Sequence, residues 1–384
     1  MEKIQRPVTA RRDIKALLAF EGRVVGSDAE RRAAKHLQAR LRESGRDAVM
    51  EPISVFPAWH LTHALHALLA IAGSVLAVDL PVLGAAIAAL ALASILGDAT
   101  GAFHLLRRLT GRRASQNVVS EEDGGKPGTL VLVAHYDTAR TGFVFGRRRP
   151  EVPPLAPLFW ATALVVLCAA LRIAGIEGRG LTAAQFVPTV VLIAHLPLLV
   201  DIALSEAVPG ANDNASGVAT ALRLADHHGG RLEHFDVWVV LTGAQESFAL
   251  GMRELLKERR RDLDRTTTLF VNLDELGRGD PRFSRREGVL FTSRSHPQLR
   301  RLAAELADDD PDARAAPLTL RSPSDAAAAQ ARGYPAITIC ARPAPDHHLR
   351  SDTPDRLDED SLERAFAFCS ELIARLDEEL GPAL

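Results

Sequence analysis

An imidazole and a carboxylate stand close together at the end of one apolar stretch of this sequence. In LVLVAHYDTARTG the apolar residues end at His135, and Asp137 stands two positions later. An imidazole that binds a metal usually donates its second N–H to a carboxylate, which fixes its orientation. His135 and Asp137 could therefore be a metal ligand and the group that orients it, although a lone histidine is more often structural.

Asp213 lies in a turn-rich segment, VPGANDNASG, directly before a predicted helix. A carboxylate in this turn could bridge two cations. It could equally be the N-cap of the helix, a role that Asn214 or Ser216 could also fill. The segment alone does not separate these two interpretations.

Two further apolar stretches end in acidic residues. VWVVLTGAQES runs to Gln245 and Glu246, and LFVNLDELG ends in Asp274 and Glu275. An acid directly after a buried strand is energetically costly unless it is paired or bound to a metal. Two such cases in one chain therefore favour a shared site.

A fifth segment, PDHHLRSDTPD, contains adjacent histidines. His347 and His348 precede Asp352. Adjacent histidines in a loop are often simply solvated. Asp352, four residues after His348, could hold either the loop or an imidazole ring.

Together the segments supply two histidines and three carboxylates that could bind metal: His135, Asp213, Glu246, Asp274 and His348. We expect all of them at strand ends or in the loops after them, because ligand sites in open α/β sheets gather at the carboxyl ends of strands. Nitrogen and oxygen ligands without thiolate suit zinc, manganese or cobalt. Two metals roughly 3.5–4 Å apart that share a carboxylate would activate a water and polarise a carbonyl.

The elements that must position these residues alternate between strands and helices. Strand patterns fall at residues 49–56, 129–134, 235–241, 268–273, 289–292 and 336–340. Helical patterns fall at residues 12–46, 216–228, 247–261, 296–307, 324–332 and 359–380. This alternation predicts an α/β domain with a mostly parallel sheet covered by helices on both faces.

Four apolar runs interrupt this domain, at residues 61–78, 80–97, 155–175 and 181–204. A helix that crosses a membrane needs roughly 20 mostly apolar residues. Buried helices of a soluble core are the alternative. Two hairpins with almost no charge favour membrane lipid as their environment, and Trp59 and Trp160 near the hairpin ends are typical of the interface.

The runs divide the chain into five parts. The α/β domain is expected to comprise residues 1–56, 107–150 (with His135 and Asp137) and 207–384, and the hairpins residues 57–106 and 151–206. Arginines flank the hairpins on the side of the α/β domain, at positions 107, 108, 112, 113 and 147–149. The turn at Asp79 has no Lys or Arg, so the positive-inside rule predicts a cytoplasmic α/β domain on what would be a bacterial-type inner membrane.

Composition argues against several other classes of protein. The formal net charge of -2 gives the chain no overall attraction to nucleic acid. The three cysteines are too scattered for a disulfide framework or a thiolate metal cluster. The charged first residues, MEKIQRPVTARRDIKALL, predict that there is no secretory signal peptide.

In their order along the chain, these segments resemble the co-catalytic zinc aminopeptidases of peptidase clan MH, which include bacterial leucyl aminopeptidases, with glutaminyl cyclases as relatives. The resemblance runs through VGSDAERRAAKHLQARLRESG, SQNVVS, HYD, PGANDNASG, GAQES, NLDELG, SDAAAAQARGYPA and HHLRSDTPD. It covers nearly all of the chain except the two hairpins. It implies a three-layer α/β/α sandwich with a mixed sheet.

The resemblance also implies a role for each residue of the site. His135 would bind one metal with Asp137 behind it, and Asp213 would bridge two metals, expected to be zinc, with manganese or cobalt possible. Glu246 would bind one metal and Asp274 the other. His348 would complete the set, with His347 as the alternative if the loop is shifted by one residue.

The sequence departs from the family pattern at Gln245. The family usually has a glutamate there, which acts as general base, and an amide cannot take that proton. Loss of a positioned base typically costs about 10²–10⁴ in rate. Glu275 or Asp325 could substitute. The family's Ser-Asp-His segment also reads Ser324-Asp325-Ala326, which indicates an altered substrate pocket.

We therefore expect a membrane-anchored, zinc-dependent aminopeptidase-like metallohydrolase in which metal-activated water attacks the amide of a peptide or aminoacyl substrate. The alternative is a catalytically impaired pseudo-peptidase that binds metal and acts as a scaffold or sensor. Acyl transfer or cyclisation, as in the glutaminyl cyclases, is a third hypothesis, and Gln245 weakens it in the same way.

Overall fold

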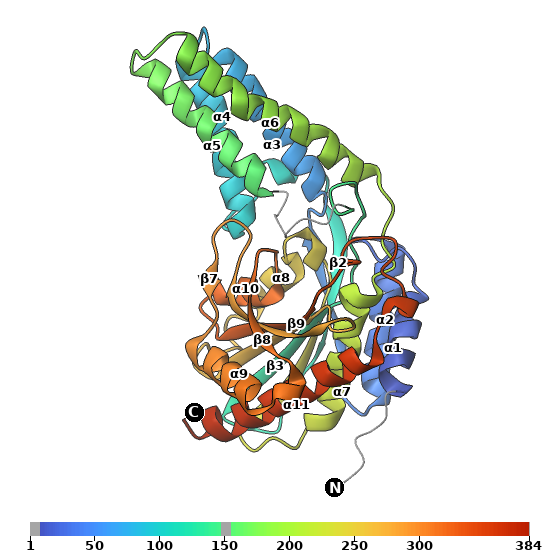
Figure 1. Cartoon of the computed structure of the whole chain (residues 1–384). Helices are drawn as coiled ribbons and strands as arrows, with labels where there is room; N and C mark the ends of the chain where they lie inside the picture. The colour runs from blue at the N-terminus through green and yellow to red at the C-terminus, as the bar shows by residue number, and fades with distance from the viewer. Residues whose placement is uncertain (1–7, 147–154, 384) are drawn as a thin grey trace. The chain divides into compact units, whose positions relative to one another are not determined.

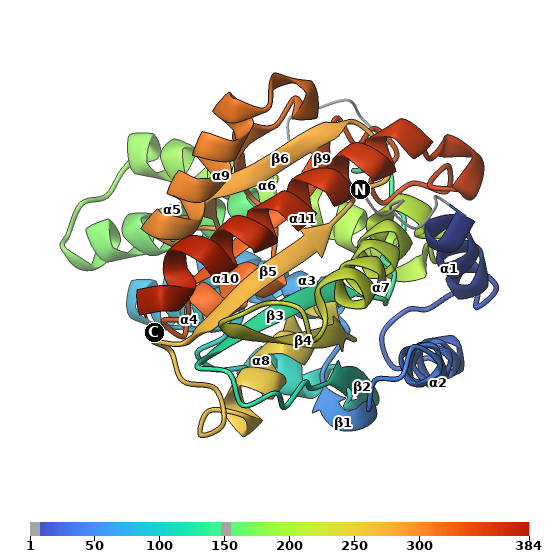
Figure 2. The ribbon, with the colours of Figure 1, turned by 90° about the horizontal axis from the view of Figure 1, so that it is seen from below.

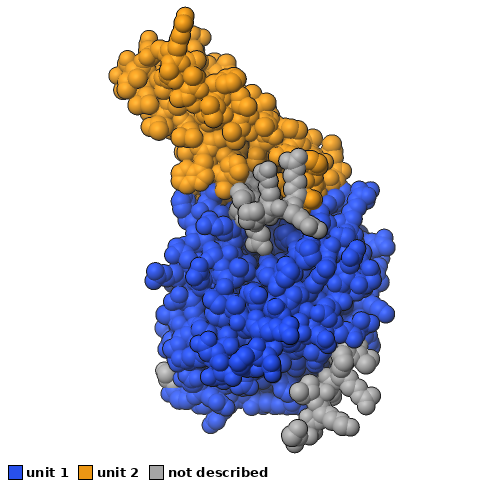
Figure 3. Space-filling model, in the orientation of Figure 1, with its two compact units in different colours: residues 1–55, 113–141, 206–384 blue, residues 56–112, 142–205 orange. Residues whose placement is uncertain are grey.

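The computed structural model describes residues 8–146 and 155–383. The chain forms two compact units (Figure 3): unit 1 comprises Met1–Val55, Arg113–Thr141 and Glu206–Leu384, and unit 2 comprises Phe56–Arg112 and Gly142–Ser205. The predicted basic residues 147–149 lie outside the described residues.

Unit 1 is built on one nine-stranded mixed sheet. Its strands are β1 (Val49–Val55), β2 (Arg113–Ser120), β3 (Gly128–His135), β4 (Phe235–Thr242), β5 (Thr268–Asp274), β6 (Asp280–Glu287), β7 (Ser293–Arg294), β8 (Ala316–Leu320) and β9 (Ala336–Arg342). The order is β1-β2-β4-β3-β5-β9-β6-β7, with β8 paired to β6. The central strands β4, β3, β5 and β9 are parallel to their neighbours within that group, and β1, β2 and β6 add antiparallel pairs at the flanks.

The helices of unit 1 are α1 (Val8–Leu18), α2 (Asp28–Glu43), α7 (Gly217–His228), α8 (Leu250–Glu258), α9 (Pro297–Asp309), α10 (Asp325–Gln330) and α11 (Glu359–Leu380). Because successive side chains of a strand point to opposite faces, β3 contributes to two cores. Leu130 and Leu132 belong to the core that contains residues of α7, α9 and α11, and Val131 and Val133 to the core that contains residues of α8 and α10.

The figures show the resulting layers. Figure 1 shows α8 and α10 above the sheet and α9 and α11 below it. In Figure 2, α11 lies in front of the strands, and it contacts β6 and β9. The predicted α/β class, with a mixed sheet between two helical layers, is confirmed.

Two of the predicted elements were wrong. The single helix expected over 12–46 is broken at residues 19–27, where Gly22 and Gly26 have φ values of 71° and 75° and Ser27 caps α2 by accepting a hydrogen bond from the Glu30 N–H at 3.0 Å. The strand expected at 289–292 is instead a turn, and the strand of that region is β6, whose charged sequence DPRFSRRE hid it.

Unit 2 is a bundle of four helices, α3 (Trp59–Leu76), α4 (Pro81–Thr100), α5 (Leu155–Ile173) and α6 (Arg179–Leu204), with the short helix η1 (Leu106–Leu109) (Figure 1). Around the bundle, α3 contacts α4 and α6, and α5 also contacts α4 and α6. Each of the four is long and apolar enough to cross a membrane.

Polar side chains lie inside this bundle. At one level His66 Nε2 is 2.8 Å from Ser94 Oγ. At another, Gln185 donates to Ser74 Oγ at 3.0 Å and accepts from Arg172 Nε at 2.9 Å. These residues are buried, so hydrogen bonds between side chains tie α3 to α4 and to α6, and tie α6 to α5.

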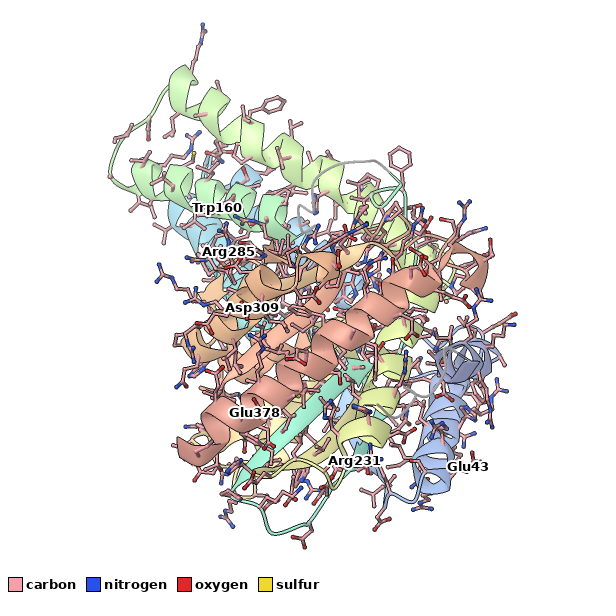
Figure 4. The ribbon with its side chains drawn as sticks, turned by 60° about the horizontal axis from the view of Figure 1, so that its bottom comes forward. Glu43, Trp160, Arg231, Arg285, Asp309 and Glu378 are labelled. Carbon is pink, nitrogen blue, oxygen red and sulfur yellow. The ribbon has the colours of Figure 1, made fainter. Side chains whose placement is uncertain are left out.

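The outside of unit 2 is apolar. Among the described residues, every exposed large apolar side chain except Val49 and Phe291 belongs to unit 2. Trp160, 59% exposed, projects from α5 in Figure 4, where the labelled side chains of unit 1 are all charged. Unit 2 therefore exposes large apolar side chains and buries polar ones among its apolar core residues, unlike a bundle made for water.

Candidate metal centre

The parallel strands of unit 1 bring the predicted ligands to one edge of the sheet. His135 is the last residue of β3, Asp274 is the last residue of β5, and Glu246 lies just after β4. His348 lies in the loop after β9. Asp213 does not follow a strand, contrary to our expectation: it lies in the irregular turn Ala211–Ser216, which connects α6 to α7.

Asp213 stands between two pairs of these residues. His135 Nε2 is 3.3 Å from Asp213 Oδ1 and 3.5 Å from Asp274 Oδ1. His348 Nε2 is 3.2 Å from Asp213 Oδ2 and 3.4 Å from Glu246 Oε2. Each oxygen of Asp213 thus faces a histidine that also contacts a second carboxylate, Asp274 for His135 and Glu246 for His348. The five predicted residues form two adjacent sets that share Asp213.

His347 also lies at this centre. Its Nδ1 is 3.3 Å from Asp213 Oδ2 and 3.0 Å from Glu275 Oε1. Glu275 Oε2 in turn is 2.9 Å from Arg342 Nη1, so His347 is held by an ion pair behind it. The geometry favours His348 as the ligand because only His348 faces both Asp213 and Glu246, whereas His347 is stacked on it with ring centroids 3.8 Å apart.

Asp137 fixes two parts of the site at once. Its backbone oxygen is 3.1 Å, and its Oδ1 3.6 Å, from His135 Nδ1. Its carboxylate also accepts the backbone N–H groups of Gln245 at 3.1 Å and Glu246 at 3.0 Å. The predicted orienting residue therefore also positions the turn that carries Glu246.

The polar residues around Asp213 dock its turn onto the end of β5. Asn214 donates to Leu273 O at 2.9 Å and accepts from Glu275 N at 3.0 Å. Ser216 Oγ accepts from Leu276 N at 2.9 Å. The approach is so close that a Cβ on Gly217 would lie 2.2 Å from Asn214 Oδ1 and 2.4 Å from Leu273 O.

Asp352 holds the same turn from the other side. Its carboxylate accepts the N–H of Asn212 at 2.7 Å and of Asp213 at 3.0 Å. Of the two roles expected for Asp352, the structure has it holding a loop, that of Asp213, rather than an imidazole ring. Burial, opposed by these hydrogen bonds, raises the pKa of Asp352 to about 7.

Two buried charged residues near the site, Arg23 and Glu30, were not predicted from the sequence. Arg23 donates to Tyr136 O at 2.9 Å and to Pro209 O and Gly210 O at 3.2 Å, so it joins the strand end of His135 to the turn of Asp213. Glu30 accepts from Gly26 N at 2.7 Å and from Ser115 Oγ at 2.6 Å. Glu30 falls on the apolar face of α2, with Ala33 and Leu37, and that position was the available sign.

Non-glycine residues in the left-handed region cluster at the ligand loops. Ala244, Glu275 and His348 have φ values of 55°, 50° and 56°. Such a backbone costs of order 1–3 kcal/mol per residue and persists where the surroundings impose it, commonly at functional sites. The surrounding structure thus holds these loops in a backbone conformation that orients the side chains of the site.

The charges of the centre shift its pKa values strongly. Burial alone would lower the pKa of His135, but the neighbouring carboxylates of Asp137, Asp213 and Asp274 raise it well above its usual value. Burial and the neighbouring His347 would lower the pKa of His348, yet Glu246 and Asp213 raise it to about 9. Burial opposes the charge of Asp213, but the three histidines hold its pKa well below the usual range.

The donor set fits divalent metal ions. Asp213 Oδ2 and Asp274 Oδ1 are buried and accept no hydrogen bond from the described residues. His135, Asp213 and Glu246 form one group with ligand atoms within 4.8 Å of one another, and Asp213, His347 and His348 form another. Buried carboxylate oxygens without donors beside imidazole nitrogens are what a bound cation would satisfy.

Gln245 lies in the position predicted for the general base, and its amide is engaged in a hydrogen bond to a neighbouring loop. Its Nε2 donates to Pro323 O at 2.8 Å, and the residue is 6% exposed. Pro323 precedes Ser324 and Asp325, the segment in which the sequence also departs from the family pattern.

Histidines and carboxylates gathered at the strand ends of an α/β sandwich are suited to binding metal ions. Comparison with known proteins identifies the family. The sequence model of Peptidase family M28 matches residues 180–373, and the chain therefore belongs to this family of peptidase-like hydrolases, whose members are typically metal-dependent. No curated protein is similar enough in sequence to count as a match.

Solved structures show the same fold. An aminopeptidase from Aneurinibacillus sp. strain AM-1 has a TM-score of 0.59 at 13% identity, covering 97% of this chain and 94% of its own. A leucine aminopeptidase precursor from Bacteroides thetaiotaomicron has a TM-score of 0.58 at 13% identity, with 96% and 97% covered. A glutaminyl cyclase from Tannerella forsythia has a TM-score of 0.59 at 13% identity, with 96% and 98% covered.

The role of Asp352 gives a first prediction. Asp352→Ala removes both acceptors that hold the turn of Asp213, so zinc affinity should fall by about 10–100-fold, as for other residues that orient ligands. Isothermal titration of metal-free protein with zinc measures this. Asp355→Ala removes an exposed acid three residues away and should leave the affinity unchanged. Equal affinities for all three proteins would contradict this role.

The raised histidine pKa values give a second prediction. At pH 7 the metal-free site holds protons on His135 and His348 that ligation must displace. Zinc binding should therefore release protons, and affinity should rise with pH up to about 9, where His348 loses its proton. Calorimetry in buffers of different ionisation enthalpy counts the protons. His348→Ala should release fewer, and His227→Ala, outside the site, the native number; zinc uptake without proton release would contradict the prediction.

Proposed function

We propose that this chain is a membrane-anchored, aminopeptidase-like metallohydrolase that holds two zinc ions, with manganese or cobalt as alternatives. The observation that carries this proposal is Asp213, whose two oxygens face separate histidine–carboxylate pairs. His135 and Asp274 would hold one ion, Glu246 and His348 the other, and Asp213 both. Asp137 would orient His135.

A metal pair, when bound, supplies Lewis acidity that polarises a carbonyl and lowers the pKa of a water. The protein side chains position the residues that would bind the metals. Asp137, Asn214, Asp352 and Arg23 hold the ligands in place through the backbone, so the site needs little rearrangement to bind metal. Gln245 can donate or accept a hydrogen bond but cannot take a proton.

The substrate we propose is a peptide or aminoacyl compound with a free amine. Membership of family M28 supports a peptidase-like hydrolase, and the aminopeptidases of the same fold support cleavage at the amino end. The four consecutive alanines after Asp325 leave the segment that contributes to the family's substrate pocket with small side chains.

We also propose that unit 2 spans a membrane as two hairpins. Its four helices contain 18, 20, 19 and 26 residues, and roughly 20 suffice to cross the hydrocarbon core. Exposed apolar side chains and buried polar ones suit a bilayer, in which polar groups must be satisfied between helices. Each hairpin returns the chain to the side from which it came, and Arg107, Arg108 and Arg112 support a cytoplasmic side for unit 1.

A membrane-extraction experiment tests the anchor. The full chain should stay with the membrane fraction through high-salt and carbonate washes and leave it only with detergent. Val82→Lys and Leu167→Lys, at exposed positions of α4 and α5, should reduce insertion, whereas Val49→Lys on β1 should not. Release of the native chain by salt alone would contradict the proposal.

An activity assay tests the function. Zinc-loaded protein in detergent should hydrolyse aminoacyl anilides, and Asp213→Asn or Glu246→Gln should lower kcat/KM by at least about 10³, since these remove ligands of both ions or of one. Asp355→Ala serves as the exposed control. Two equivalents of zinc without hydrolysis in the native chain, together with activity in Gln245→Glu, would instead support the impaired pseudo-peptidase.

A further inference from the structure

A buried carboxyl that is neither a proposed ligand nor fully paired lies beside the metal centre. Asp325, the first residue of α10, is completely buried. Its Oδ2 accepts a hydrogen bond from Thr242 Oγ1 at 2.6 Å. Its Oδ1 is buried and has no hydrogen-bond partner among the described residues. A carboxylate in this state is costly unless a proton, a water or a substrate group satisfies the second oxygen.

The position of Thr242 places this carboxyl at the ligand edge of the sheet. Thr242 is the last residue of β4 and the register partner of His135 on β3. The titratable groups that act electrostatically on Asp325 are His135, Asp137 and Asp274. Asp325 therefore lies on the side of the centre formed by His135 and Asp274.

The other acids of the centre are already engaged. Asp137 and Asp352 each accept two backbone N–H groups. Glu275, the other candidate from the sequence, is bound on one oxygen by Arg342 and on the other by His347. Although burial opposes it, this pairing lowers the pKa of Glu275, which makes it a poor proton acceptor at neutral pH.

Gln245 and Asp325 are linked through the same loop. The Gln245 amide donates to Pro323 O, two residues before Asp325. A glutamate at position 245 would turn an acceptor toward that carbonyl, so this loop geometry suits the amide. Burial raises the pKa of Asp325 to about 7, near the optimum for a group that exchanges protons at neutral pH.

We infer that Asp325 Oδ1 is the proton acceptor that replaces the missing glutamate at position 245; this rests on the proposed hydrolase function. As the attacking water forms its C–O bond to the amide carbonyl, one of its protons passes to Asp325 Oδ1. When the C–N bond breaks, the same proton passes to the leaving nitrogen. The carboxylate is regenerated, and no other reactant is needed.

Asp325→Asn tests this inference, because asparagine keeps the size and the acceptor for Thr242 but cannot take a proton. In the zinc-loaded full chain, kcat should fall by about 10²–10⁴, while KM and zinc content stay native. The acidic limb of the kcat/KM profile against pH should disappear. Gln245→Glu added to Asp325→Asn should restore part of kcat, because it returns a carboxylate beside the loop that carries residue 325.

A matched control separates chemistry from loop structure. Glu287 is a buried acid that accepts a hydrogen bond from Ser324 Oγ, in the same loop, and lies outside the metal centre. Glu287→Gln should keep kcat within a few-fold of native. An equal loss in Glu287→Gln and Asp325→Asn, or native kcat in Asp325→Asn, overturns the inference.

A spectroscopic readout keeps this test independent of turnover. With cobalt in place of zinc, the visible absorption of the native chain should change with pH, and Asp325→Asn should shift that midpoint. If the native protein hydrolyses no aminoacyl anilide, the proposed function is wrong. The cobalt titration would still test whether Asp325 exchanges a proton at the site. Identical titrations in the two proteins overturn the inference.

Discussion

Asp213 places a negative charge in the interior, and much of unit 1 is arranged around it. A buried carboxylate needs compensation from hydrogen bonds or cations. Here the backbone N–H of Asp213 and that of its neighbour are held by Asp352, and both carboxylate oxygens are left to face histidines. The turn is fixed by its backbone so that the side chain remains available.

Arg23 extends this arrangement across the chain. It is 1% exposed and binds carbonyl groups on both sides of the site rather than a carboxylate. Burial lowers its pKa to about 10, although Asp137, Asp352 and Asp213 oppose the shift, so it remains positively charged at neutral pH. This one buried cation thus connects the end of the strand that carries His135 to the turn of Asp213. Its positive charge also interacts favourably with Asp137, Asp213 and Asp352.

Features that depend on local sequence patterns could be predicted from the sequence. The apolar runs of β3, β4, β5 and β9 located the parallel core, and acids directly after two of them indicated the site. β6 was missed because Arg282, Arg285 and Arg286 hide a strand that lies toward the edge of the sheet. The role of Asp352 could not be read from the sequence, because its partners Asn212 and Asp213 lie 140 and 139 residues away. Glu30 and Arg23 were missed because charged residues near helices are usually solvated.

The two units differ at their surfaces, because large exposed apolar side chains gather on unit 2 and are rare on unit 1 among the described residues.

X-ray absorption at the zinc edge most directly tests the proposed two-metal site of unit 1. We expect a metal–metal distance of about 3.5–4 Å, with nitrogen and oxygen ligands only, and loss of that distance in Asp213→Ala. A single zinc with no second scatterer in the native chain would contradict it.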